Sequence, residues 1–392
     1  MDVMDKELKV PKLRFKDEDG REFPQWEKRR LGEVALNISS GKSQKCEDGK
    51  YSLYGSTGII GNSREADYLG SKLIIARVGA CGFCRFVTEP CGISDNALVI
   101  TSNDYNYNLQ WLYYCVSIKH LERYAIGTAQ PLITGSLLKR INLLFPTLPE
   151  QRKIADFLTA YDELIDNQKK RVEVLKLRKK GLLQKIFSQE IRFKDDEGRE
   201  FPKWEERRLG EVGVIIGGGT PSTENEKYWN GKINWLTPLE INCKYVRPSL
   251  RKITELGYTN SSAKLLPKGT VILTTRASVG LCSIQNTDDK FTTNQGFQSI
   301  LFDAQRIYFE YGYYCLMTTA IQTKMKRLAS GTTFLELSSS NLKKIKLPLP
   351  TLPEQRKIAD FLSIADRQIF LEEKRLDTMR LIKKALLQQL FV

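Results

Sequence analysis

The stretch Thr147–Leu158 reads T-L-P-E-Q-R-K-I-A-D-F-L, and Thr351–Leu362 repeats it letter for letter. A second pair of blocks, Arg14–Val34 and Arg192–Val212, agrees at 17 of 21 positions. The opening blocks are offset by 178 residues and the T-L-P-E-Q-R blocks by 204, so the second copy is 26 residues longer between them. Self-similarity on this scale indicates an internal duplication, in which each copy is a divergent globular module followed by a nearly constant segment.

Each T-L-P-E-Q-R block opens a long segment without proline, 150–187 in the first copy and 354–391 in the second. Apolar residues recur there at alternating steps of four and three, which is a heptad pattern and predicts long helices packed lengthwise. The alternative is that each helix covers only its own module. The predicted seam consists of Ile154, Leu158, Tyr161, Ile165, Val172, Leu175, Leu182 and Ile186, then Ile358, Leu362, Ala365, Ile369, Leu376, Met379, Leu386 and Leu390, with polar interruptions at Gln168, Lys179, Glu372 and Lys383.

The modules have the pattern of mixed α/β structure. Short β-branched runs lie between Gly, Asn and Ser turns and predict strands at 72–76, 97–100, 269–274 and 297–302. One helix is expected in each module, at 109–124 and 308–328.

Composition narrows the class of protein. The chain has 392 residues, enough for two domains, and 61 Lys and Arg against 46 Asp and Glu, a net charge of +15. Such a surplus favours an anionic partner, nucleic acid or a membrane surface; the alternative is a soluble protein kept apart by self-repulsion. No apolar run is long enough to span a bilayer and no secretory signal is visible, so we expect no membrane association. Eight sparse cysteines fit a reducing cytoplasm.

The sequence offers little for catalysis. Ser40–Ser43 reads S-G-K-S, but Leu36 stands where a phosphate-binding loop requires glycine. Cys81 and Cys84 have spacing that suits a zinc site, which Cys46 and Cys91 could complete. The matching stretch of the second module keeps only Cys282, and buried free thiols are the commoner explanation. The single histidine, His120, is expected to be an ordinary helix residue. We therefore expect no catalytic residue, no metal and no cofactor.

The duplication itself suggests a mode of binding. Two homologous modules held by paired helices form an internal pseudo-twofold, and duplex DNA offers two nearby grooves to such a molecule. Because the modules diverge, the two half-sites should differ. The positive charge would supply affinity for the DNA backbone, and polar loop residues would read the bases.

The residues also resemble a known family. The doubled L-P-E-Q-R-K-I-A, the doubled W-E-x-R-R-L-G-E-V, and loops such as Y-G-S-T-G-I-I-G from Tyr54, N-W-L-T-P from Asn234 and T-N-Q-G-F from Thr293 are similar to the specificity subunit of type I restriction–modification enzymes. The resemblance covers residues 14–391. It implies two target-recognition domains and two long antiparallel helices that dock two methyltransferase subunits, to which ATP-driven restriction subunits can add. It also implies that catalysis lies on those partners. The expected boundaries are an N-terminal extension at 1–13, domains at 14–146 and 191–350, and helices at 147–190 and 351–392.

Loops at matching places in the two modules are the candidate DNA contacts. Arginine suits guanine edges and phosphates, and side-chain amides suit adenine edges. Asp95 and Asn96 also fit a simple turn, and Arg77 an internal pair. The candidates are Lys42, Ser43, Tyr54, Ser56, Arg77, Ser94, Asp95 and Asn96 in the first module, and Thr220, Ser222, Thr223, Trp235, Thr237, Arg276, Thr293, Asn294 and Gln295 in the second. On the helices, Arg152, Lys153, Arg356 and Lys357 are candidates for a partner surface or the DNA backbone, or form a solvated face.

The sequence therefore predicts a non-catalytic subunit that recognises duplex DNA. Two other interpretations stay open: a stand-alone nuclease for split sites, and a coiled-coil scaffold that does not bind DNA.

Overall fold

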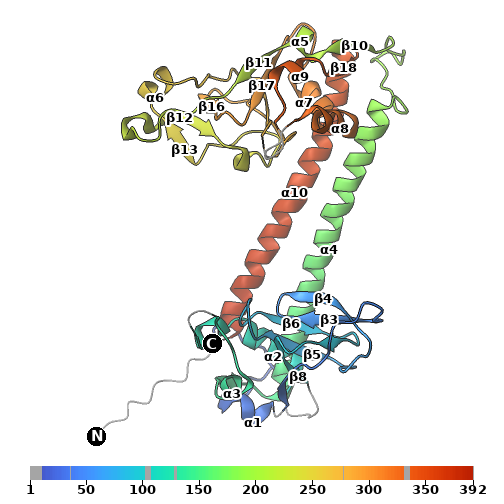
Figure 1. Ribbon diagram of the computed structural model, residues 1–392. Coiled ribbons are helices and arrows are strands. Elements are labelled where there is room, and N and C mark those ends of the chain that lie inside the picture. The colour runs from blue at the N-terminus through green and yellow to red at the C-terminus, as the bar shows by residue number, and fades with distance from the viewer. Residues whose placement is uncertain are drawn as a thin grey trace. The chain divides into compact units, whose positions relative to one another are not determined.

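The computed structural model describes residues 11–35, 37–101, 107–127, 130–276, 278–330 and 336–391 (Figure 1). The chain forms two compact units. The first combines residues Met1–Lys170 with Glu373–Val392, and the second is Arg171–Glu372. Each unit therefore contains one module together with one segment of each long helix.

The first module is built on three small sheets. Strand β1 (Glu27–Arg30) pairs with β9 (Asn142–Phe145), which brings the two ends of the module together. A four-stranded antiparallel sheet has the order β2 (Ile38–Ser40), β8 (Ala97–Thr101), β5 (Lys72–Ala76) and β6 (Cys84–Val87). A three-stranded sheet has the order β4 (Gly58–Ser63), β3 (Tyr51–Gly55) and β7 (Gly92–Ile93), with β3 and β7 parallel. Helices α1 (Leu31–Val34), α2 (Leu109–Ser117) and α3 (Gly135–Lys139) and the 3₁₀ turn η1 (Leu121–Tyr124) complete it.

The second module repeats this topology strand for strand. The closing pair is β10 (Glu205–Arg208) with β18 (Lys346–Leu349). The four-stranded order is β11 (Gly213–Gly217), β17 (Gln298–Phe302), β14 (Val271–Leu273) and β15 (Cys282–Ile284). The three-stranded order is β13 (Arg251–Ile253), β12 (Trp229–Leu236) and β16 (Phe291–Thr293), with β12 and β16 parallel. The remaining elements are α5 (Leu209–Val212), η2 (Glu226–Tyr228), η3 (Pro238–Glu240), α6 (Glu255–Thr259), α7 (Phe309–Met317), α8 (Thr319–Leu328) and α9 (Ser339–Lys343).

The predicted long helices are confirmed as α4 (Leu148–Phe187) and α10 (Leu352–Leu390). Both begin two residues before the predicted segments, so Pro149 and Pro353 lie in the first turn, where their missing N–H costs nothing. The apolar residues of the predicted seam are all buried or half-buried. The heptad pattern therefore identified the covered face of each helix.

In the first unit, the helix segments run antiparallel and are joined by a polar contact. Asp162 of α4 forms an ion pair with Lys383 of α10 and accepts a hydrogen bond of 2.8 Å from Tyr114 of the module. Further towards the start of α4, Leu158 packs in the same core as Leu390. Lys383, which the sequence pattern marked as an interruption of the seam, is therefore the partner of an aspartate on the other helix.

The second unit repeats this contact with the roles of the helices exchanged. Lys179 of α4 forms an ion pair with Asp366 of α10, and Tyr314 donates a hydrogen bond of 2.6 Å to the same carboxylate. Arg171 and Glu372 form a second pair at 2.9 Å. Along α4 the residue number rises as it falls along α10, so the segments are antiparallel here too.

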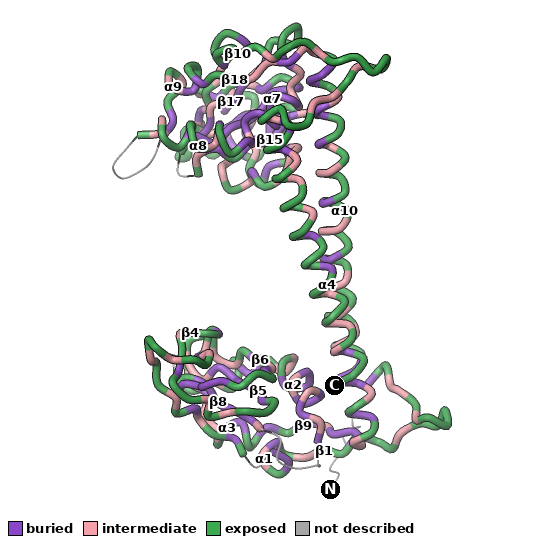
Figure 2. Tube along the Cα trace, turned by 90° about the vertical axis from the view of Figure 1, so that its right-hand side faces the viewer, coloured by how far each residue is buried: buried purple, intermediate pink, exposed green. Residues whose placement is uncertain are grey.

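The end of each helix packs into the core of a module (Figure 2). In the first unit, the ring of Phe391 lies 6.4 Å from that of Trp26 and 6.2 Å from that of Trp111. In the second, Phe187 stacks on Tyr311 at 5.6 Å. Aromatic pairs at these distances add to the hydrophobic stabilisation of burial.

A buried carboxylate joins each opening block to its helix. Glu150, in the first turn of α4, is fully buried. Both of its oxygens accept hydrogen bonds from the Arg14 guanidinium, at 2.9 and 2.8 Å, and one also accepts the Trp26 indole N–H at 3.1 Å. A buried charge requires this degree of pairing, because an unpaired carboxylate in an apolar interior is strongly destabilising.

The second copy has the same arrangement. Glu354 is fully buried, accepts two bonds from Arg192 at 3.1 and 3.0 Å, and accepts the Trp204 indole N–H at 3.0 Å. The acid, the arginine and the tryptophan all belong to the duplicated blocks. Three residues of the duplicated blocks therefore make the same buried contact in both copies.

The glutamine that follows each buried glutamate fixes the module helix. The side-chain carbonyl of Gln151 accepts the backbone N–H of Asn108, just before α2, at 2.8 Å. The side-chain amide of Gln151 donates to the backbone carbonyl of Pro146 at 2.9 Å. Gln355 accepts the Tyr308 backbone N–H at 2.8 Å in the second copy.

The module helices are shorter than predicted. The segment 109–124 breaks after α2 because His120 adopts a left-handed conformation with φ of 49°. The segment 308–328 breaks at Thr318, whose extended backbone and side-chain oxygen form the N-terminal cap of α8. His120 is exposed and contacts Glu122 at 3.0 Å. No helix among the described residues is long and apolar enough to cross a membrane.

We predict that Glu354→Gln lowers the free energy of unfolding by about 3 kcal/mol, because it removes the charge that balances Arg192 in a buried site. Asp360→Asn, at an exposed position on the same helix, should change it by less than about 0.5 kcal/mol. Urea unfolding of the full chain measures both. Equal midpoints for the two variants would show that the buried carboxylate does not hold the module to the helix.

Candidate nucleic-acid interface

In the first module, the predicted loops meet around one short connection between the two larger sheets. Residues 94–96, here called the first connecting loop, join β7 of the three-stranded sheet to β8 of the four-stranded sheet. The Ser94 N–H donates to the Tyr54 carbonyl at 2.8 Å, and the Arg77 N–H donates to the Asn96 carbonyl at 3.0 Å. The ends of β3 and β5 are thus both fixed to this loop.

The loop after β2 is hydrogen-bonded to the end of β7, directly before the first connecting loop. The Ser43 N–H donates to the Ile93 carbonyl at 2.9 Å, and the Ser43 hydroxyl accepts the Ile93 N–H at 2.8 Å. Gly41 lies so close that a Cβ built on it would be 2.1 Å from the Ile93 oxygen. Only glycine allows this approach, so the geometry of the site requires glycine at position 41.

The candidate side chains of the first module divide by exposure. Lys42, Asp95 and Asn96 are exposed, whereas Tyr54 and Ser94 are buried. Burial and a hydrogen bond of 2.6 Å to Glu89 raise the pKa of Tyr54 to about 12, so its hydroxyl is neutral at physiological pH. Tyr54 therefore supports the loops and does not reach their surface.

Two half-buried candidates are bound to the connecting loop. Ser56 donates to the Asn96 carbonyl at 2.8 Å, and a guanidinium nitrogen of Arg77 donates to the Asp95 carbonyl at 3.4 Å. The Arg77 Nε and the Ser94 hydroxyl are buried without a hydrogen-bond partner. Two polar groups at this edge are therefore left without a hydrogen-bond partner.

The second module forms the corresponding edge around the second connecting loop, residues 294–296. The Asn294 N–H donates to the Leu236 carbonyl at 3.1 Å, and the Thr275 N–H donates to the Gly296 carbonyl at 2.8 Å. A Cβ on Gly218 would be 1.8 Å from the Asn294 oxygen, the same close approach as at Gly41.

The candidate side chains of the second module also differ in their exposure. Ser222, Thr223, Arg276 and Gln295 are exposed; Thr220, Thr237 and Asn294 are half-buried; Trp235 and Thr293 are buried. Thr220 donates to the Gln295 side-chain oxygen at 2.6 Å, and Thr237 donates to Glu240 at 2.7 Å. Arg276 is paired with Glu336 at 2.9 Å.

The Trp235 side chain and the Ser222 backbone form hydrogen bonds inside this edge. The Trp235 indole N–H donates to the Gly219 carbonyl at 2.9 Å, and the Ser222 carbonyl accepts the Trp229 indole N–H at 3.0 Å. Thr223 is exposed on the same loop, and none of the described contacts joins it to the connecting loop.

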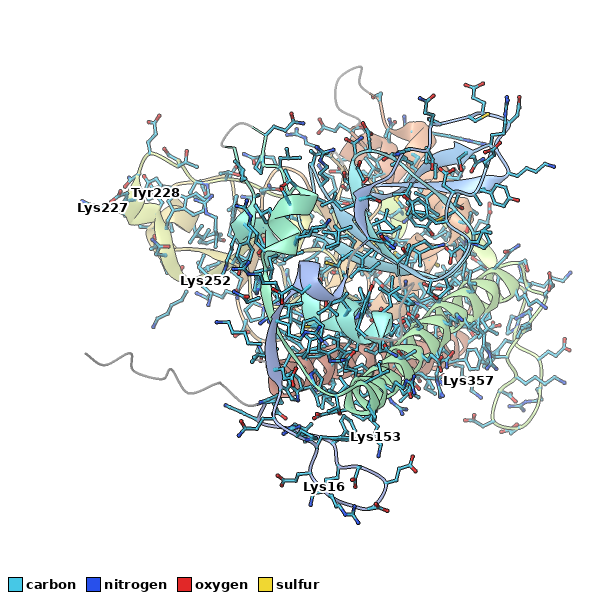
Figure 3. All side chains as sticks on the ribbon, turned by 90° about the horizontal axis from the view of Figure 1, so that it is seen from below. Lys16, Lys153, Lys227, Tyr228, Lys252 and Lys357 are labelled. Atoms are coloured by element: carbon cyan, nitrogen blue, oxygen red, sulfur yellow. The ribbon has the colours of Figure 1, made fainter. Side chains whose placement is uncertain are left out.

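Three of the four basic residues proposed for a partner surface already have contacts within the chain, whereas Arg152 is exposed and makes no polar contact with the described residues. Lys153 donates to the Lys16 carbonyl at 2.8 Å (Figure 3), and Lys357 donates to the Lys194 carbonyl at 2.8 Å. The Arg356 guanidinium lies 4.7 Å from the Tyr308 ring centre. Their assignment to a partner stays a prediction.

Sequence reasoning missed Arg251, which lies beside Trp229 and Trp235 at this edge. No motif identifies it, because the contact depends on the pairing of β12 with β13. The cysteines form no metal centre in the described part of the chain, where no group of three or more His, Cys, Asp or Glu residues is arranged to hold an ion.

The first edge presents an exposed cation, carboxylate and amide, and the second presents exposed hydroxyls, an amide and a cation. Such groups donate to and accept from base edges and phosphate oxygens. The backbone scheme is the same in the two modules, whereas the exposed side chains differ.

Comparison with known proteins gives consistent matches. A family model described as the type I restriction modification DNA specificity domain matches residues 24–177 and again residues 202–380. The type I restriction enzyme MjaIX specificity subunit of Methanocaldococcus jannaschii is 36% identical over 210 residues, 53% of this chain and 48% of that protein. The putative MjaX specificity subunit of the same organism is 29% identical over 280 residues, 69% of this chain and 63% of that protein. The chain thus spans about half to two thirds of the length of these relatives.

Solved structures share the fold. The S subunit of a type I restriction–modification system from M. genitalium superposes with a TM-score of 0.61 at 20% identity, over 98% of this chain and 99% of that one. A chain from a study of complex assembly and conformational transition in the type I system gives a TM-score of 0.58 at 20% identity, over 94% and 98%.

We predict that Gly218→Ala lowers the free energy of unfolding by about 1–3 kcal/mol, because the added methyl group overlaps the second connecting loop. The matched control is Gly181→Ala in α4, where a Cβ meets nothing within 4 Å and alanine should stabilise the helix by about 1 kcal/mol. Urea unfolding of the full chain gives both values. Unchanged stability of Gly218→Ala would contradict the tight packing of this edge.

Proposed function

Because the chain belongs to the family of type I restriction–modification DNA specificity proteins, we propose that it is the non-catalytic subunit that selects the DNA sequence for a type I complex. The observation that carries this proposal is the duplicated edge. Each module holds three loops around one connecting loop by the same backbone bonds, and each presents different polar side chains there.

We propose that each module reads one half of a bipartite site in duplex DNA. The difference in exposed residues makes the halves unlike: Lys42, Asp95 and Asn96 are exposed in the first module, and Ser222 and Gln295 in the second. The net charge of +15 supports affinity for the phosphate backbone, which would fall steeply as salt rises.

The paired helices are the proposed docking site for two methyltransferase subunits. Both helices carry large exposed apolar side chains that a bound subunit would cover. More than half of the side chain is exposed at Leu164, Val174 and Leu177 on α4 and at Ile364, Leu371 and Leu381 on α10. Methyl transfer and ATP-dependent cleavage are assigned to the methyltransferase and restriction subunits of the complete complex.

The direct test combines the chain with methyltransferase subunits of its own system and maps the methylated bases on genomic DNA. The expected result is one bipartite motif with unlike halves. The chain alone, supplied with Mg²⁺ and duplex DNA, should not cleave. Cleavage by the chain alone would favour a stand-alone nuclease, and a complex that neither binds nor methylates DNA would favour a scaffold.

A variant of the same experiment tests whether the helices set the gap. Deleting residues 163–169 and 376–382 removes one heptad from each helix and leaves Asp162 beside Lys383. Because a heptad is about 10 Å of helix, the gap should shorten by about three base pairs, with the letters of both halves unchanged. Altered letters with an unchanged gap would contradict this role. The control is deletion of one segment alone, which breaks the register of the seam.

A further inference from the structure

Arg251, the first residue of β13, is an exposed cation held against two aromatic rings. Its guanidinium carbon lies 3.8 Å from the ring centre of Trp229 and 5.3 Å from that of Trp235. Among the described residues, no hydrogen bond or ion pair occupies this guanidinium. Contact with the two rings therefore restrains an exposed guanidinium, and no described partner competes for its N–H donors.

The two rings are themselves fixed to the candidate interface. They meet edge to face at 5.1 Å, and both indole N–H groups donate to the loop after β11, to the carbonyls of Ser222 and Gly219. The Gly219 N–H in turn donates to the Thr293 carbonyl at 2.8 Å, directly before the second connecting loop. Arg251 thus belongs to the edge that we propose contacts DNA.

An arginine mounted in this way suits a bidentate acceptor. A guanidinium is planar, stacks on aromatic rings and matches the paired acceptors N7 and O6 of guanine in the major groove. Phosphate is the other candidate, since it accepts the same fork. Guanine is favoured because its two acceptors lie in one fixed plane that matches a guanidinium held against aromatic rings, and a phosphate contact is an outcome of the test below.

We propose that Arg251 reads a guanine in the half-site of the second module, an inference that rests on the function proposed above. The first module has no arginine at the corresponding position. Trp235 faces Arg251 across β12 and β13, and the corresponding cross-strand pair in the first module is Leu53 with Gly61. The register of the parallel strands supports this correspondence, since Trp235 pairs with Thr292 and Leu53 with Gly92. The guanine contact is therefore specific to one half of the site.

The test uses the full chain in complex with its methyltransferase subunits and maps methylated sites for four proteins: the unaltered chain, R251K, R251Q and the control K252A. Lysine keeps the charge but loses the planar fork, whereas glutamine suits adenine. Lys252, labelled in Figure 3, is the adjacent cation on β13. It pairs with Asn234 and not with Trp235, so the alternation of a strand puts its side chain on the face opposite to that of Arg251.

R251K should lose discrimination at one guanine of one half-site by roughly 10- to 100-fold, with the other half and the gap unchanged. R251Q should shift the preference at that position towards adenine. K252A should keep every letter of the motif. Urea unfolding of each chain checks that the fold is intact, as expected for a side chain without hydrogen bonds.

Two results would overturn the inference. The first is a methylated motif that does not change in either variant. The second is a motif with the same letters that R251K and R251Q bind uniformly more weakly, because such a loss would identify a phosphate contact. Failure of the proposed function is distinguishable, because the unaltered complex would then give no bipartite motif at all.

Discussion

The structure depends on a carboxylate buried at the start of each long helix. Glu150 and Glu354 are inaccessible to water, and each is satisfied only when an arginine and a tryptophan from the opening block reach it. Loss of the arginine leaves a charge unpaired in an apolar interior, and loss of the tryptophan removes one of its hydrogen bonds. This constraint fixes where each module begins and where its helix starts. The chain between these points can vary, provided that it returns to the same place.

The sequence predicted the helices well because their signal is local. Apolar residues at heptad spacing identified the covered face of α4 and α10. The start of each helix was predicted to within two residues. The same pattern gave no role to Lys179 and Lys383, since their aspartate partners lie on the other helix, far along the chain. These pairs favour one antiparallel register over others, which apolar contacts alone do only weakly.

The candidate site could be predicted as a group of loops but not residue by residue. Comparing the two copies selected loops that the structure places around the connecting loops. Exposure could not be predicted, because Tyr54 and Trp235 lie on strands whose inward face depends on the packing of two sheets. Arg251 was missed for a related reason: its contact with Trp235 exists only across a strand pair. The extra length of the second copy lies mainly between β12 and β14, where it builds η3 and α6.

The central claim is that a constant frame presents two unlike DNA-reading edges. Hydrogen–deuterium exchange on the complex of the chain with its methyltransferase subunits tests it most directly, with cognate duplex and with duplexes in which one half-site is scrambled. The account predicts that cognate duplex slows exchange in peptides containing residues 41–43 and 94–96 of the first module and residues 218–223 and 294–296 of the second. Each scrambled duplex should remove the protection from one module only. Equal protection by all duplexes, or protection confined to α4 and α10, would contradict the claim.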